Sequence, residues 1–363
     1  MLCRGRQDQP VQLDEEPDAR QCGGRSLAAP FRGAAGSAFS GRGARRINFH
    51  SDGGTIDLKR FRGALLLTLT ALIWGTAFVA QSLGMDHLGP FTFNGVRNFV
   101  AALGLLPVIL FLRRRQGEEG TDGAAPRSRK TLWLGGALCG LALGVASSLQ
   151  QIGIQYTTVG KAGFLTALYI VIVPLLGLLF KKRVALPVWV SVVIAAAGTY
   201  LLSIKEDFTI GSGDLFVILC AACFSVHILL VDRFSPAVSG VELSCVQFLV
   251  AGAFSTAVAF LVETPDLHDI LRSWGPILYT GLISSGVGYT FQILGQKDTQ
   301  PAVASLIMSL ESVFAALSGW LLLGQGMTGR EAFGCALVFA AVVLAQIPFS
   351  ALRGRRAARK KSA

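Results

Sequence analysis

Two ionisable residues lie inside long apolar stretches of this chain. Glu311 is eleven residues into the stretch 301–323, near the middle of a membrane span, and Arg97 is eight residues into the stretch 90–112. An ionised side chain in hydrocarbon costs about 2.5–3.5 kcal/mol on insertion scales, so each needs a partner or a water-filled cavity. We expect Glu311 to bind a cationic group or a proton. Arg97 is expected to bind a carboxylate, which the planar guanidinium group matches with two hydrogen bonds.

Structural interpretations of both residues stay open. Glu311 could instead be a partner of Arg97 or of a helix end, and Arg97 is near enough to one membrane face to reach the lipid headgroups. If both bind solute, their opposite charges suit a zwitterion such as an amino acid. Asn94, three residues before Arg97, shares its helical face and is a further candidate.

Aromatic and amide side chains gather in the same apolar stretches. For any single one of them, contact between helices or a place at the membrane interface is the simpler explanation. Their shared distribution, however, predicts a cavity that binds a small-molecule substrate. The remaining candidates for its wall are Trp74, Gln81, Tyr169, His227, Tyr289 and Gln292.

One cluster has the spacing of a metal site. Cys220, Cys223 and His227 fall on one helical face, where they could hold a soft metal ion. No fourth ligand is evident, so we interpret the cysteines as small packing residues and His227 as either a cavity residue or a structural histidine. No catalytic residue, metal site or cofactor is predicted. The chain lacks a GxxxxGK[ST] phosphate-binding loop, so a gradient rather than ATP is expected to supply energy.

The chain in which these residues lie is mostly apolar. Of 363 residues, 52% are hydrophobic and only 15% are charged, whereas charged residues make up about 25% of soluble domains. Windows of about 20 apolar residues recur ten times, which predicts an all-α integral membrane protein with ten transmembrane helices. The predicted spans are 62–83, 90–112, 131–153, 160–180, 185–204, 213–232, 240–262, 274–296, 301–323 and 330–349.

The two ends of the chain differ in composition from the apolar spans. Residues 1–58 are rich in Gly, Arg, Ala and Ser and contain no apolar run, so we expect a disordered N-terminal extension. Residues 350–363 are expected to form a basic cytoplasmic tail. The net charge of +11 lies mostly beside the membrane spans, which favours contact with the lipid bilayer and not with nucleic acid.

The basic residues also predict an orientation. Of the basic residues from Lys59 onward, Arg97 excepted, twenty fall on one side of the membrane and four on the other, which places both termini in the cytoplasm and requires an even number of spans. The halves 62–204 and 213–349 then hold five spans each and enter the membrane in opposite senses, as inverted repeats do. Spans one to four and six to nine are expected to line the pathway. The stripe Gly136, Gly140 and Gly144 predicts close helix contact, and Pro174 could kink the fourth span.

Four segments carry a resemblance. Tyr156–Tyr169, His227–Ser235, Gly295–Lys297 and Ser309–Trp320 occur in order over roughly 62–349. Together they resemble members of the drug/metabolite transporter superfamily with two EamA-type domains. The resemblance implies ten helices in two inverted five-helix repeats around a central cavity, and movement of small metabolites, often in export.

We therefore predict a secondary transporter, not an enzyme, that moves a small metabolite, amino acid or drug-like solute by alternating access in the plasma membrane of a bacterium (the inner membrane). The alternative is an integral-membrane enzyme acting on a lipid-linked substrate. Such an enzyme needs acids or histidines that converge at one interface, and the loops show no such motif. A structural or assembly protein has no reason to keep Arg97 and Glu311 within the bilayer. The oligomeric state stays open, with a homodimer as one alternative.

Overall fold

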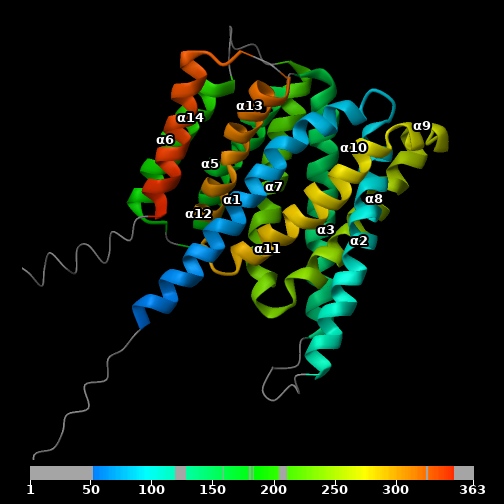
Figure 1. The fold of residues 1–363 in the computed structure, drawn as a ribbon, viewed down its shortest axis with the longest axis horizontal. Helices are drawn as coiled ribbons and strands as arrows, with labels where there is room; N and C mark the ends of the chain where they lie inside the picture. Colours follow the sequence, from blue (N-terminus) through cyan, green and yellow to red (C-terminus); the bar gives the residue numbers. More distant parts are fainter. Residues whose placement is uncertain are drawn as a thin grey trace, which may run out of the picture. The chain divides into compact units, whose positions relative to one another are not determined.

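The computed structural model describes residues 52–118, 128–157, 159–179, 181–182, 184–203, 211–323 and 326–346. Every regular element in these ranges is a helix (Figure 1). Nine helices in this part of the chain are long and apolar enough to cross a membrane, and Leu186–Leu202 is a shorter apolar helix. The extension 1–58 falls largely outside the described residues, and the tail 350–363 falls wholly outside them. The chain is thus an all-helical, multi-pass membrane protein.

Each of the ten predicted ranges holds a helix. The uninterrupted ones are α1 (Asp52–Gly84), α2 (Pro90–Glu118), α3 (Arg129–Tyr156), α6 (Leu186–Ser203), α7 (Ser212–Phe234), α8 (Gly240–Val262) and α14 (Gly329–Gln346). The predicted span 185–204 contains the shorter apolar helix Leu186–Leu202, and each of the other nine predicted spans matches a helical stretch long and apolar enough to cross a membrane.

Three of the predicted spans are interrupted. The range 160–180 divides at Leu168 into α4 (Val159–Ala167) and α5 (Tyr169–Leu179), and 301–323 divides at Ser309 into α12 (Pro301–Met308) and α13 (Leu310–Leu323). The first break lies six residues before Pro174, and α5 runs through the proline. The range 274–296 changes its winding, from α10 (Trp274–Leu278) through the π-helix η2 (Tyr279–Tyr289) to α11 (Thr290–Gln296). Two short elements complete the list, the 3-10 helix η1 (Ser235–Ala237) and α9 (Leu267–Arg272).

The first five ranges pack against the last five in a reciprocal pattern. α2 packs on α8 and α6 on α14, so the second and fifth helices of each half meet their counterparts. Figure 1 shows α6 and α14 side by side. α3, the third span of the first half, packs on α7, the first span of the second half. The reverse arrangement also occurs, because α1, the first span of the first half, packs on η2 and α11 in the third span of the second half. Each of these contacts therefore has a counterpart in which the two halves exchange roles.

Glycines allow two of these corresponding helix pairs to touch through their backbones. A methyl group built on Gly153 of α3 would lie 2.9 Å from the carbonyl oxygen of Gly213 in α7, and one built on Gly213 would lie 3.0 Å from that of Gly153. Gly63 of α1 and Gly295 of α11 show the same relationship, at 3.0 and 2.9 Å. Any larger residue would push these helices apart.

The predicted glycine stripe of α3 also makes close contact, in this case with α8. A methyl group on Gly136 would lie 2.3 Å from Val246, and one on Gly140 would lie 2.6 Å from the carbonyl oxygen of Gln247. This confirms the close approach that the small-residue spacing predicts.

Apolar side chains occupy the interior and also much of the outer surface. Phe248 and Leu143 are fully buried between the halves, whereas Phe260 is 72% exposed and Leu261 82% exposed. Lipid tails solvate such a surface well, and the polar groups are concentrated inside.

Candidate functional site

A narrow cavity lies between the two halves. Its volume is only about 30 Å³, taken as the space open to the centre of a water-sized sphere. Helices α1 to α5, α7, α11 and α13 contribute to the wall, together with η2, whereas α6, α8 and α14 contribute no residue to it. The lining residues are Trp74, Phe78, Gln81, Arg97, Gln150, Thr166, Tyr169, Phe224, Ile228, Ser284, Tyr289, Gln292 and Glu311. We call this space the central cavity.

The two charged residues of the central cavity have separate neutral partners. Arg97 is 5% exposed and donates from Nη1 to the Gln81 side-chain oxygen at 3.1 Å. Its guanidinium carbon lies 5.6 Å from the centre of the Phe93 ring, and its Nε atom has no hydrogen-bond partner. Glu311 is 3% exposed and accepts a hydrogen bond from the Tyr169 hydroxyl at 2.9 Å. No ion pair joins Arg97 to Glu311 within the described part of the chain.

This separation has an energetic consequence. A charge buried in a medium of low dielectric constant is stabilised by a charge of opposite sign, and neutral hydrogen bonds compensate only part of its desolvation. We call Arg97 and Glu311 the two poles of the central cavity. Each pole therefore attracts a group of opposite charge. A ligand that carried both charges would compensate both poles at once.

The helix breaks position Tyr169 and Glu311. Tyr169 is the first residue of α5 after the break at Leu168, and Glu311 is the second residue of α13 after the break at Ser309. Interrupted helices bring backbone groups and helix termini to the middle of a membrane, where they can meet a solute. The side chains of the two half-helices thus meet inside the central cavity.

An aromatic wall faces these poles. The Trp74 and Tyr289 rings lie 4.6 Å apart between centroids, and the Trp74 ring N–H donates to the Ser284 carbonyl oxygen at 3.2 Å. Ser284 and Tyr289 belong to the π-helix η2, in which the changed winding shifts side chains relative to an α-helix. π-helical turns occur frequently at functional sites. Phe78 and Phe224 extend the apolar lining.

Amide side chains supply the remaining polarity. Gln150 donates to the Thr166 hydroxyl oxygen at 3.2 Å. Gln292 is 1% exposed, and its side-chain oxygen has no hydrogen-bond partner. An unpaired buried acceptor costs free energy, about 1–3 kcal/mol. A donor on the solute would remove this cost.

The structure brings seven of the nine predicted site residues into the wall: Trp74, Gln81, Arg97, Tyr169, Tyr289, Gln292 and Glu311. Asn94 and His227 lie outside it. Asn94 is fully buried, and neither its side-chain nitrogen nor its side-chain oxygen has a hydrogen-bond partner. His227 shares a 3.1 Å hydrogen bond with Gln247 and packs edge-on against Tyr289, with ring centroids 5.9 Å apart. The other ring nitrogen of His227, Nδ1, is buried and has no hydrogen-bond partner.

Sequence reasoning missed six lining residues: Phe78, Gln150, Thr166, Phe224, Ile228 and Ser284. One signal was available for Gln150. It lies three residues before Gly153 and nine before the start of α4, and Gln292 stands in the same relation to Gly295 and α12. A comparison of the two halves would have paired the two glutamines.

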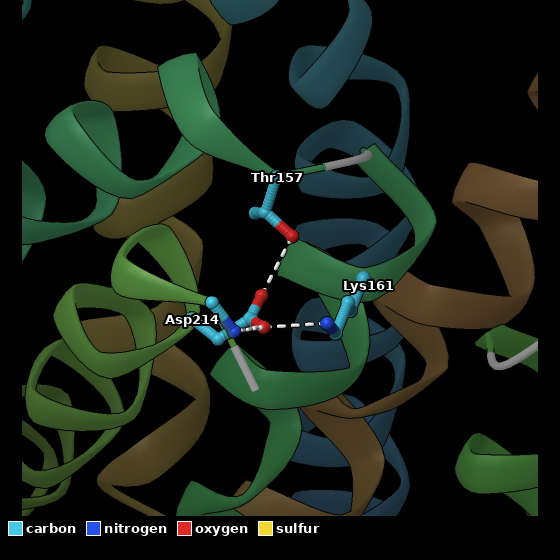
Figure 2. Close-up of polar contacts among 4 residues, drawn as sticks. Thr157, Lys161 and Asp214 are labelled. Carbon is cyan, nitrogen blue, oxygen red and sulfur yellow. Dashed lines mark hydrogen bonds and ion pairs between the residues drawn. The ribbon is translucent and has the colours of Figure 1, made fainter. Parts of the chain in front are cut away.

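An ion pair lies at the end of the molecule predicted to be extracellular (Figure 2). The Lys161 ammonium group of α4 lies 2.5 Å from Oδ2 of Asp214 in α7. Asp214 is 2% exposed and also accepts hydrogen bonds from the Thr157 hydroxyl and the Gly211 N–H, each at 2.7 Å. This cluster joins the first half of the chain to the second.

A metal site is not evident in the described ranges, where no three His, Cys, Asp or Glu side chains lie close enough to hold an ion. Cys220 is buried and Cys223 is half-buried, and both are free thiols.

Comparison with known proteins gives a consistent result. The model of the EamA-like transporter family matches residues 61–204 and 211–346. An uncharacterised transporter of Archaeoglobus fulgidus is 30% identical over 81% of this chain and 89% of its own length. A probable amino-acid metabolite efflux pump of Salmonella typhimurium is 24% identical over 82% of this chain and 98% of its own.

Two further similarities are more distant. A threonine/homoserine exporter of Salmonella typhimurium is 25% identical over 56% of this chain and 68% of its own length. A solved crystal structure superimposes with a TM-score of 0.64 over 81% of this chain and 98% of that chain, at 19% identity. The structural match concerns the fold alone.

Proposed function

Because the chain belongs to the EamA-like transporter family, we propose that it is a secondary transporter that exports a small zwitterionic metabolite of the amino-acid class. The family is one of transporters and not of enzymes, so a small-molecule substrate and a membrane follow from membership. The class of substrate, the direction and the mechanism are our proposal. The central cavity is its binding site.

The observation that carries this proposal is the separation of charge in the central cavity. Arg97 and Glu311 have only neutral hydrogen-bond partners, Gln81 and Tyr169. A carboxylate binds Arg97 through two parallel hydrogen bonds, and an ammonium group binds Glu311. The aromatic wall of Trp74 then contacts the apolar part of the solute.

Alternating access is the proposed mechanism. The reciprocal contacts between the halves, together with five predicted spans in each, support two repeats of inverted topology. In such a pair, rocking of one half against the other exposes the central site to each side of the membrane in turn. The narrow cavity and the Lys161–Asp214 ion pair fit a state in which the predicted extracellular end is closed.

The proposed location is the bacterial plasma membrane, with both termini in the cytoplasm. The support is the excess of basic residues on one side of the predicted spans. Names of relatives support the substrate class, since they include an amino-acid metabolite efflux pump and a threonine/homoserine exporter.

The test is solute counterflow in liposomes that contain the purified full chain. Vesicles are loaded with an unlabelled amino acid, and uptake of the same labelled compound is measured. We expect counterflow of at least one amino acid, with competition by other zwitterions. The amine that lacks the carboxylate and the 2-hydroxy acid that lacks the ammonium group should compete far less. Equal competition by these singly charged analogues would contradict a two-pole site.

A further inference from the structure

A second, wider cavity opens beside the turn between α11 and α12, at the end of the molecule predicted to be cytoplasmic. About 510 Å³ of it can take the centre of a water-sized sphere, against about 30 Å³ in the central cavity. Its wall includes Val173 of α5, Leu229 of α7 and Gln296 of α11. We call this space the vestibule.

Three helices lead from the vestibule to the central cavity. On α11, Gln296 lines the vestibule and Gln292, one helical turn earlier, lines the central cavity. On α5, Val173 and Tyr169 have the same relationship. On α7, Leu229 directly follows Ile228 of the central cavity. The two cavities thus adjoin along these three helices.

Gln296 presents an unpaired acceptor in the wall of the vestibule. Its side chain is 2% exposed, and its amide nitrogen donates to the Ile228 carbonyl oxygen at 3.3 Å. A carbonyl oxygen can only accept, so this bond fixes which end of the amide is the nitrogen. The side-chain oxygen is buried and has no hydrogen-bond partner. The Gln292 oxygen one turn away is also unpaired.

In the vestibule wall the Gln296 oxygen is an unpaired hydrogen-bond acceptor, whereas the lysine donors are already used. The two lysines of the wall already donate to the protein, Lys182 to the Asp232 carboxylate and Lys297 to the Val238 carbonyl oxygen. A primary ammonium group offers three N–H donors and a positive charge. It can satisfy the Gln296 oxygen, and the vestibule wall also holds the carboxylates of Asp232 and Asp298.

Resting on the proposed function, we propose that the vestibule is a second solute site in which Gln296 accepts a hydrogen bond from the solute's primary ammonium group. The solute then moves one helical turn to Gln292 and the central cavity. The vestibule site is reached from the predicted cytoplasmic side, which is the loading side of an exporter.

A labelling experiment tests the site without transport. Thr299, which also lines the vestibule, is replaced by cysteine in a full chain whose seven native cysteines are replaced by serine or alanine. Its reaction with a membrane-impermeant thiol reagent is timed with methylammonium or with tetramethylammonium present. Both are monovalent cations, but only methylammonium has N–H donors. We expect methylammonium to slow labelling severalfold and tetramethylammonium to have little effect.

Variants decide which residue is responsible. Gln296→Leu should abolish the protection by methylammonium, whereas Gln155→Leu, the same change on an exposed residue of α3, should preserve it. Equal protection by both cations, or protection that survives Gln296→Leu, would overturn the proposal. No protection at all would mean that water alone occupies the vestibule.

Transport supplies an independent readout. With labelled threonine in the counterflow assay, Gln296→Leu should raise the half-saturating concentration roughly tenfold, because one hydrogen bond to a charged group is lost. The maximal rate should change little. Absence of amino-acid counterflow in a chain that still shows methylammonium protection would reject the proposed function and leave the vestibule site standing. An unchanged half-saturating concentration in Gln296→Leu would count against the site.

Discussion

The Tyr169 hydroxyl and the Glu311 carboxylate form a 2.9 Å hydrogen bond although the residues are 142 positions apart. Each lies within two residues after the break in an interrupted helix, Tyr169 in the first half and Glu311 in the second. The same spacing of 142 residues separates Gly153 from Gly295 and Gln150 from Gln292. The bond therefore joins corresponding positions of the two halves, one of which carries a hydroxyl donor and the other a carboxyl acceptor.

Replacing Glu311 with glutamine should remove most transport. The change keeps the size of the side chain and an oxygen for Tyr169, but it removes the charge that the ammonium group of the solute needs. A hydrogen bond to a charged group contributes about 1.5–3 kcal/mol, so we expect a rate constant at low solute concentration roughly 10- to 150-fold lower. Counterflow in liposomes measures this.

Glu242→Gln is the matched control for that prediction, because Glu242 pairs with Arg113 outside the central cavity. It should transport nearly as well as the unmodified chain. A Glu311→Gln variant that is folded and transports at the control's rate would show that Glu311 is not a pole of the site.

Arg97 should be sensitive to the shape of its charged group as well as to its charge. Arg97→Lys keeps the charge but loses the planar pair of donors, and Arg97→Gln loses both. We expect half-saturating concentrations for an amino acid to rise in the order Arg, Lys, Gln. The amine lacking the carboxylate should bind neither variant more weakly than it binds the unmodified chain. An equal loss of affinity for the amine and for the amino acid would contradict a carboxylate contact at Arg97.

The sequence alone predicted the helices and the charged poles because both depend on local composition. A stretch of about 20 apolar residues is a span wherever it occurs, and Glu311 and Arg97 stand out because charge is costly there. The interruptions at Leu168 and Ser309 follow no such rule. Their flanking residues are ordinary helix residues, so local composition does not reveal the breaks.

The parts of the site that the sequence did not reveal are those with ordinary residue types. Phe224 and Ile228 resemble any other apolar residue of a membrane helix, and only the packing of α7 places them in the central cavity. His227 is the converse case. Its residue type suggested a cavity, but its hydrogen bond to Gln247 places it behind the wall.

The Gly153–Gly213 contact should be required for stability. In Gly153→Ala the new methyl group would lie 2.4 Å from Val217 and 2.9 Å from the Gly213 carbonyl oxygen, so α3 and α7 must separate. Overpacking of this kind typically costs about 1–3 kcal/mol. We expect a lower midpoint of thermal unfolding in detergent, measured by tryptophan fluorescence.

Gly163→Ala is the control for this change. A methyl group on Gly163 of α4 has no neighbour within 4 Å, and alanine is favoured over glycine in a helix by about 0.8–1.0 kcal/mol. Its unfolding midpoint should stay equal or rise. A Gly153→Ala variant as stable as Gly163→Ala would refute close backbone contact at this crossing.

The Lys161–Asp214 ion pair should hold the predicted extracellular end closed. Opening that end separates α4 from α7 and breaks the pair, so loss of either partner favours the open state. The readout is labelling of a cysteine placed at Phe78 in the central cavity, in a chain without native cysteines. An impermeant reagent is added from outside intact cells. Lys161→Gln and Asp214→Asn should each speed labelling, roughly tenfold if about 1.4 kcal/mol is lost.

The double variant distinguishes a shared contact from two separate effects. If the residues act through their ion pair, Lys161→Gln together with Asp214→Asn should label no faster than either single variant, because the second change removes nothing further. Thr157→Val removes only the 2.7 Å hydrogen bond to Asp214 and should have a smaller effect. Labelling rates that multiply in the double variant would show that Lys161 and Asp214 act independently, and the ion pair would then not be the element that keeps this end shut.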